Sequence, residues 1–99
     1  MKRPVRVLRR AQIDLLEIQA YVLRDDPGAA EELVDALIDR LRRLETLSDR
    51  GALPRDLRLR QAGYRYVVHG DYLIFYKVLP SQVRVYRVIH GRRRYARLL

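Results

Sequence analysis

The sequence predicts an α+β fold: a short N-terminal strand, a helical hairpin, then a three-stranded antiparallel meander. Two observations support this prediction. Apolar residues recur at helical spacing through the first half of the chain, and β-type runs separated by short turns occupy residues 64–89. A length of 99 residues leaves room for a single domain, residues 1–99. We expect one sheet with both helices on the same face.

The N-terminal strand is expected at Val5–Leu8, at the edge of the sheet, since the preceding Pro4 is tolerated at strand starts. The period then changes to that of a helix ending near Asp25. The apolar stripe of this helix follows the spacing i, i+4, i+7, i+11: Ala11, Leu15, Ile18 and Val22.

The second helix has clear boundary signals. Asp26 is a favourable N-cap, Pro27 suits the first helical position, and Gly51 is a stop signal. Because only a short Asp-Asp-Pro-Gly segment joins the two helices, we expect an antiparallel hairpin. The buried stripe of the second helix is expected to contain Ala30, Leu33, Val34, Leu37, Leu41, Leu44 and Leu47.

The second half of the chain is expected to supply the meander. In the connection Ala52–Ala62, Leu57 and Leu59 alternate with charged residues, which favours a further strand there. Gly70-Asp71 and Pro80-Ser81 are turn signals. The strands that these turns separate are Tyr64–His69, Tyr72–Val78 and Val83–Ile89.

The formal charge of +9 is unevenly distributed. Residues 1–49 contain nine Lys and Arg against ten Asp and Glu, whereas residues 50–99 contain twelve against two. A field this one-sided attracts a polyanion or an acidic protein segment. The sequence therefore predicts an anionic partner for the second half of the chain.

Several classes of protein are disfavoured. The chain has no cysteine, so disulfides and thiolate metal sites are excluded, and two distant histidines make a poor zinc site. We expect neither a metal nor a cofactor. The N-terminal MKRPVRVLRR lacks the apolar core of a signal peptide, and no apolar run is long enough to span a membrane. We therefore expect a cytoplasmic protein without a membrane partner.

Two stretches resemble the RelE/ParE superfamily of toxins from type II toxin–antitoxin modules. GYRYVVHGDYLIFYKV and VRVYRVIHGRRRYARLL are similar to the C-terminal half of these toxins, and Ile89–Arg93 is the most specific part. The N-terminal half agrees through a helix motif formed by Ala11, Asp14, Leu15, Ile18 and Tyr21.

The resemblance implies a small toxin that a cognate acidic antitoxin neutralises. It also implies one of two activities. ParE-like members inhibit DNA gyrase and have no recognised nuclease site, whereas RelE-like members cleave mRNA in the ribosome. A ParE-like protein is favoured, because Asp56 stands where some nucleases of the group place a catalytic lysine and because Tyr95 follows the last strand early.

The alternative of a RelE-like ribonuclease needs a group on the phosphate and groups for proton transfer. Arginine suits the phosphate because its planar fork matches two oxygens. By resemblance, Arg65, at the Gly-Tyr-Arg position, would contact the phosphate together with Arg92 or Arg93, and His90 or Tyr95 would transfer protons. Each has a structural alternative: a strand-face cation for Arg65, a backbone-bonded histidine for His90, and a ring packed on the sheet with Leu98-Leu99 for Tyr95.

The binding hypothesis uses the arginines of the second half. Arg94 replaces the acid that is usual in this ending, which makes the C-terminal segment more electropositive. Such a cluster would pair with an acidic antitoxin or bind phosphates. The arginines expected to contact an antitoxin or a target are Arg58, Arg60, Arg65, Arg87, Arg92, Arg93 and Arg94. A basic nucleic-acid-binding module without toxicity is the third hypothesis. The strand tyrosines and Phe75 are expected to pack in the core rather than stack on bases.

Overall fold

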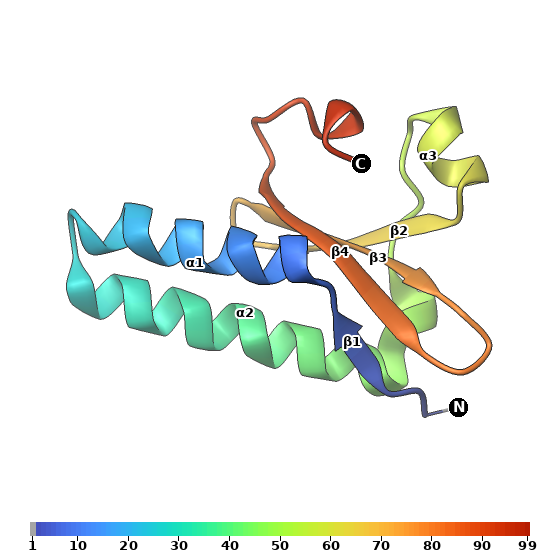
Figure 1. The fold of residues 1–99 in the computed structure, drawn as a ribbon, viewed down its shortest axis with the longest axis horizontal. Helices are drawn as coiled ribbons and strands as arrows, with labels where there is room; N and C mark the ends of the chain where they lie inside the picture. The colour runs from blue at the N-terminus through green and yellow to red at the C-terminus, as the bar shows by residue number, and fades with distance from the viewer. Residues whose placement is uncertain (1) are drawn as a thin grey trace.

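The computed structural model describes residues 2–99 and forms a layered α+β fold (Figure 1). The helical elements are α1 (Arg9–Leu23), α2 (Pro27–Leu47), α3 (Leu57–Gln61) and the single 3₁₀ turns Ser48–Arg50 and Tyr95–Arg97. The strands are β1 (Val5–Val7), β2 (Tyr64–His69), β3 (Tyr72–Val78) and β4 (Val83–His90). The predicted α+β order is confirmed.

The four strands form one sheet in the order β1-β4-β3-β2. The short strand β1 lies at an edge, as expected, and runs parallel to β4, while β2, β3 and β4 form the antiparallel meander. The register pairs Tyr72 with His90 and Arg65 with Tyr76. The pairing of β3 with β4 shifts between Phe75 and Tyr76.

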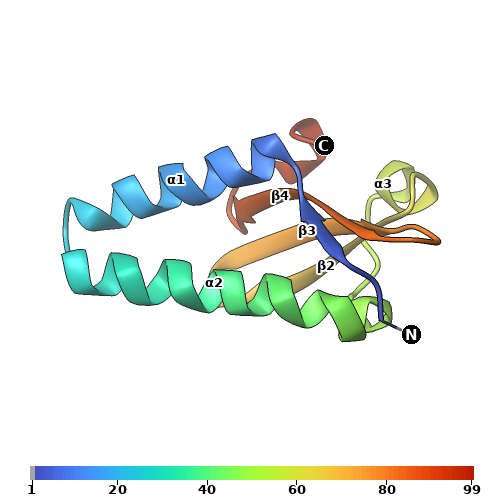
Figure 2. The same cartoon turned by 60° about the horizontal axis from the view of Figure 1, so that its bottom comes forward.

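The helices α1 and α2 form an antiparallel hairpin that covers one face of the sheet and extends beyond it (Figures 1 and 2). Asp26 caps α2, since its carboxylate accepts a hydrogen bond from the backbone N–H of Ala29 at 3.1 Å. The main hydrophobic cluster between the layers includes Leu37, Ile74 and Val85. None of the helices in residues 2–99 has the length and apolarity needed to cross a membrane.

The second face of the sheet is covered by α3 and the C-terminal segment. Leu59, Tyr64, Phe75 and Ile89 form its buried centre, and Tyr95, Leu98 and Leu99 pack against it. The ring centroids of Tyr95 and Phe75 are 5.0 Å apart. The residues after β4 therefore fold back onto the sheet, and the strand aromatics contribute to the core as expected.

The expectation of a strand around Leu57 and Leu59 was wrong. Residues 57–61 form α3, whose N-cap is Asp56, with its carboxylate 3.1 Å from the N–H of Leu59. Two residues two positions apart lie on the same face of a strand, but they point in nearly opposite directions on a helix. Leu59 is buried and Leu57 is 60% exposed, so the short helix packs one leucine against the sheet and leaves the other in solvent. The connection instead pairs with β2 through a single bridge, Ala52 to Tyr66.

Candidate functional site

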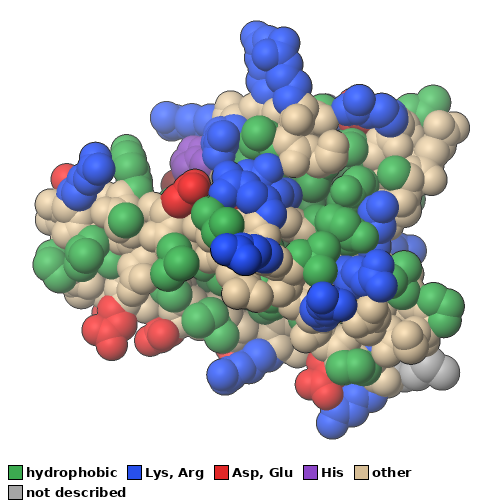
Figure 3. All heavy atoms as spheres, in the orientation of Figure 1, with side chains coloured by type: hydrophobic (Ala, Val, Ile, Leu, Met, Phe, Trp, Pro, Cys, Tyr) green, Lys and Arg blue, Asp and Glu red, His purple; other side chains and the backbone are tan. Residues whose placement is uncertain are grey.

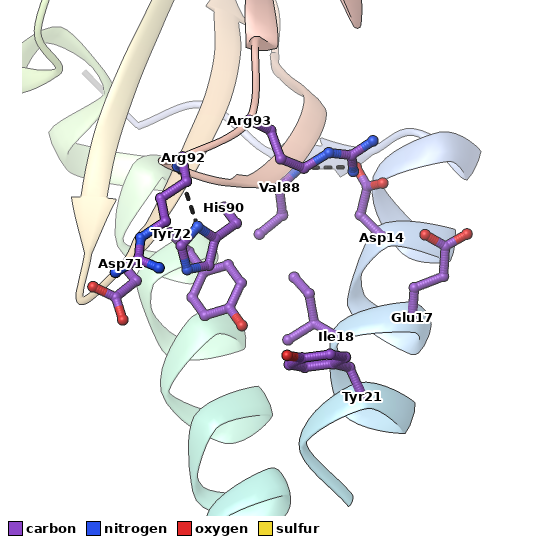
Figure 4. A pocket seen from close by; sticks show the side chains of 10 residues that line it. All are labelled: Asp14, Glu17, Ile18, Tyr21, Asp71, Tyr72, Val88, His90, Arg92 and Arg93. Atoms are coloured by element: carbon purple, nitrogen blue, oxygen red, sulfur yellow. Dashed lines mark hydrogen bonds between the residues drawn. The ribbon is translucent and has the colours of Figure 1, made fainter. Parts of the chain in front are cut away.

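A pocket of about 620 Å³ opens between α1, the β2–β3 turn and the end of β4 (Figure 4). In Figure 4, side chains of α1 form one wall, and Asp71, His90 and Arg92 form the opposite wall. The pocket is lined by Asp14, Glu17, Ile18, Tyr21, Asp71, Tyr72, Val88, His90, Arg92 and Arg93. It therefore combines an apolar and aromatic interior with charged groups of both signs.

A buried ion pair joins α1 to β4 beside this pocket. The Asp14 carboxylate accepts hydrogen bonds from Arg87 Nε at 2.8 Å and Nη2 at 3.0 Å, and from the N–H of Val88 at 3.0 Å. Asp14 is 3% exposed and Arg87 is 6% exposed. Arg10 lies 3.4 Å from the same carboxylate. The paired charges satisfy each other, as buried charges must.

The same arginine reaches the C-terminal segment. Arg87 Nη1 donates to the backbone carbonyl of Leu98 at 2.9 Å. One buried guanidinium thus contacts α1 and the segment after β4. Because it is buried, Arg87 is not part of the exposed basic surface.

His90 is held by backbone contacts at the end of β4. Its Nδ1 accepts a hydrogen bond from the N–H of Arg92 at 3.1 Å, and its ring meets that of Tyr72 edge-on at 5.4 Å. Burial raises the pKa of Tyr72 above its usual value of 10.0, and the charges of Asp71 and Tyr21 raise it further. The Tyr72 hydroxyl therefore stays neutral at physiological pH.

The exposed arginines follow directly after His90. Arg92, Arg93 and Arg94 are all exposed, and the first two line the pocket. Figure 3 shows Lys and Arg side chains gathered over the sheet and the C-terminal segment, with acidic side chains along the hairpin. These three arginines form the surface that we call the basic rim.

Three other arginines of the second half, Arg58, Arg60 and Arg65, donate to backbone carbonyls. Arg58 donates to Ala96 at 2.8 Å and Arg60 to Pro54 at 3.0 Å. Arg65 donates to Asp49 at 3.2 Å and Gly51 at 3.3 Å, and so holds the chain after α2 against β2. In this structure these three side chains stabilise the connections between elements.

The structure does not bring the four suggested nuclease residues together. Arg65 pairs with Tyr76 and His90 with Tyr72, so the two positions are separated by four residues along β3, about 13 Å at strand spacing. Tyr95 packs on Phe75, in the cluster on the other face of the sheet. Only His90 and Arg93 share the pocket.

The sequence reasoning missed the pairing of Asp14 with Arg87, which are 73 positions apart. One signal was present, since Asp14 lies on the same side of its helix as Ala11 and Ile18, within the predicted apolar stripe. An acid on a buried stripe requires a partner. The identity of that partner is set by the approach of α1 to β4.

The structure thus defines a small α+β protein with a charged pocket and a basic rim beside the end of its last strand. Residues 5–95 match the model of a family described as ParE toxin of type II toxin-antitoxin system, parDE. The chain belongs to this family of ParE toxins, and the RelE/ParE resemblance is confirmed.

Two further similarities agree with this assignment. The chain is 29% identical over 82 residues to Toxin RelE3 of Caulobacter vibrioides, covering 83% of this chain and 87% of that protein. It also superposes on a chain of a solved structure described as a chromosomal ParDE TA system from P. aeruginosa, with a TM-score of 0.77 and 17% identity. That match covers 90% of this chain and 96% of the other, and it supports the fold.

Proposed function

We propose that this toxin inhibits growth by binding DNA gyrase and that a cognate acidic antitoxin neutralises it. The separation of the suggested nuclease residues is the main support. Arg65 is engaged by two backbone carbonyls, His90 Nδ1 accepts an N–H, and Tyr95 is packed on the opposite face. General acid–base catalysis requires such groups within hydrogen-bond reach of one reacting centre. A protein-binding mechanism has no such requirement.

The basic rim supports the second part of the proposal. Arg92, Arg93 and Arg94 are exposed and follow one another without an intervening acid. A guanidinium forms bidentate hydrogen bonds with carboxylates, so an acidic segment of an antitoxin fits this surface. The solved relative of similar fold is described as part of a ParDE toxin–antitoxin system, which agrees with an antitoxin partner.

A ribosome-dependent mRNA endonuclease is the second candidate. The name of the relative Toxin RelE3 and the presence of His90 and Arg93 in one pocket favour it. In that mechanism Arg93 would neutralise charge on the phosphate and His90 would transfer a proton. The nitrogen left for that transfer is Nε2, because Nδ1 accepts the Arg92 N–H.

Expression of the chain in cells without an antitoxin separates the two candidates. Under the gyrase proposal we expect filamentous cells, a DNA-damage response and intact mRNA. Rapid loss of translation with mRNA cut within codons would contradict it and favour the endonuclease. Normal growth with a folded protein would contradict both and favour a non-toxic nucleic-acid-binding module.

A second set of variants tests the basic rim. We propose that the same rim also contacts the target, so replacing Arg92 and Arg93 together by glutamate should abolish growth inhibition by reversing the charge of the rim without touching the core. The double variant Arg50→Glu, Arg55→Glu is the matched control, since both side chains are exposed before α3 and the change of net charge is the same. Equal loss of toxicity in the control would show that net charge alone is responsible.

A further inference from the structure

Helix α1 carries a second apolar stripe that the fold does not use. The buried stripe of this helix faces α2 and β4 through Ala11, Leu15 and Ile18. On the opposite side, four apolar residues follow the 3-4-3 spacing of a helix–helix seam. They are Ile13, Leu16, Ala20 and Leu23.

Three of the four residues of this outer stripe are exposed, and Ile13 is half-buried. Leu16 is 64% exposed and Leu23 is 51% exposed, and Ala20 is also exposed. Figures 1 and 2 show α1 at the outside of the molecule, with no other element of residues 2–99 against its outer side. Hydrophobic side chains are accordingly visible on the hairpin surface in Figure 3. A contiguous apolar stripe at the surface commonly marks an interface.

We propose that the outer stripe of α1 is a self-association surface, on which a second copy of this chain packs its own α1 in antiparallel orientation. Such a contact has two-fold symmetry and closes after two copies. The inference stands apart from the choice between gyrase and mRNA as the target, because it uses neither the pocket nor the basic rim.

The sizes of the stripe residues fit this arrangement. An antiparallel pairing centred at position 18 places residue i opposite residue 36 minus i of the second copy. Leu16 then faces Ala20, and Ile13 faces Leu23, on both sides of the symmetry axis. Each large side chain at the centre meets a small one, which allows the two helices to approach closely.

The charges at the ends of α1 select the antiparallel orientation. Exposed Arg9 lies at the N-terminal end, and exposed Asp25 follows the C-terminal end. Antiparallel packing places Arg9 of one copy within about one helical turn of Asp25 of the other. Parallel packing would oppose like charges, which is unfavourable.

The contact is expected to be weak. A helix of 15 residues is about 22 Å long, so the stripe alone buries less surface than a permanent dimer. The association should therefore be reversible and depend on protein concentration and on salt.

Sedimentation velocity of the purified full chain at rising concentration tests the proposal. We expect a shift from monomer to dimer, at least a tenfold weaker association for Leu16→Glu, and no change for Leu53→Glu. Leu53 is the matched control because it is 53% exposed in the connection after α2, away from α1. Monomer at every concentration, or equal loss in the control, would overturn the proposal. Circular dichroism checks that each variant is folded.

Charge reversal and cross-linking test the orientation. Arg9→Glu and Asp25→Arg should each weaken the dimer at low salt, and their combination should restore it. The chain has no cysteine, so Ile13→Cys and Leu23→Cys chains can be mixed under oxidising conditions. We expect a disulfide dimer in the mixture only, because identical positions would be about 15 Å apart. A disulfide dimer formed by either variant alone would overturn the proposed orientation. Binding of an antitoxin to the outer stripe, with a free chain that stays monomeric, would overturn the proposal of self-association.

Discussion

Removal of the Asp14 carboxylate should destabilise the protein more than any surface change. Arg87 is 6% exposed in the structure; in Asp14→Ala its guanidinium would lose both hydrogen bonds to its counter-ion, and the N–H of Val88 would lose its acceptor. Breaking a buried ion pair by removing one partner costs about 3–5 kcal/mol. A chain of this length has a free energy of unfolding of about 5–15 kcal/mol, so Asp14→Ala should remove a large part of the total stability.

The measurement is the free energy of unfolding from urea or guanidinium titration followed by circular dichroism. Asp39→Ala is the matched control, since Asp39 pairs with Arg43 at 2.9 Å but both side chains are more than half exposed. Exposed pairs contribute about 0–1 kcal/mol. The control should therefore change stability little.

A double variant separates the charge from the packing. Asp14→Ala with Arg87→Leu removes both charges, so it should be more stable than Asp14→Ala alone, by the logic of a double-mutant cycle. A loss below about 1 kcal/mol for Asp14→Ala, or a double variant less stable than the single one, would refute the reasoning.

Three further predictions concern other parts of the structure. Burial raises the pKa of Tyr72 and Tyr76 above 10.0, so the folded state holds these protons more tightly than the unfolded state. The contribution of these two tyrosines to stability should therefore be constant below pH 10 and fall as the pH rises above it, as measured by unfolding titrations at alkaline pH; no fall would contradict the assigned burial. Gly51→Ala should cost about 1–3 kcal/mol, because an added Cβ would overlap the Tyr76 hydroxyl; an unchanged melting temperature would exclude this close approach. The Arg92→Glu, Arg93→Glu double variant should keep wild-type stability while losing antitoxin affinity by calorimetry, since both side chains are exposed; unchanged affinity would place the antitoxin elsewhere.

The sequence predicted the fold well because its local signals agree with the tertiary structure. The cap at Asp26 and the turn at Gly70-Asp71 lie where the structure has a helix start and a hairpin. The connection before β2 was predicted wrongly because two leucines spaced by two match the alternation of a strand, whereas the structure buries only Leu59 and leaves Leu57 exposed. The N-cap contact from Asp56 to Leu59 favours the helix.

The site was harder to predict because it depends on contacts between distant residues. A sequence shows that Arg65 and Arg87 are cations, but it does not show what each side chain meets. Arg65 reaches carbonyls 14 and 16 positions away, and Arg87 reaches Asp14 across 73 positions. The arginines after the last strand, Arg92, Arg93 and Arg94, were easier to interpret. No acidic residue stands near them in the sequence, which indicated a basic binding surface.

The action of the purified chain on purified DNA gyrase tests the central proposal most directly. Supercoiling of relaxed plasmid is measured with wild-type chain, with the Arg92→Glu, Arg93→Glu variant and with the Arg50→Glu, Arg55→Glu control. We predict inhibition by the wild type and by the control, and none by the Arg92→Glu, Arg93→Glu variant. Full supercoiling in the presence of folded wild-type chain would contradict the proposal that this toxin acts on gyrase.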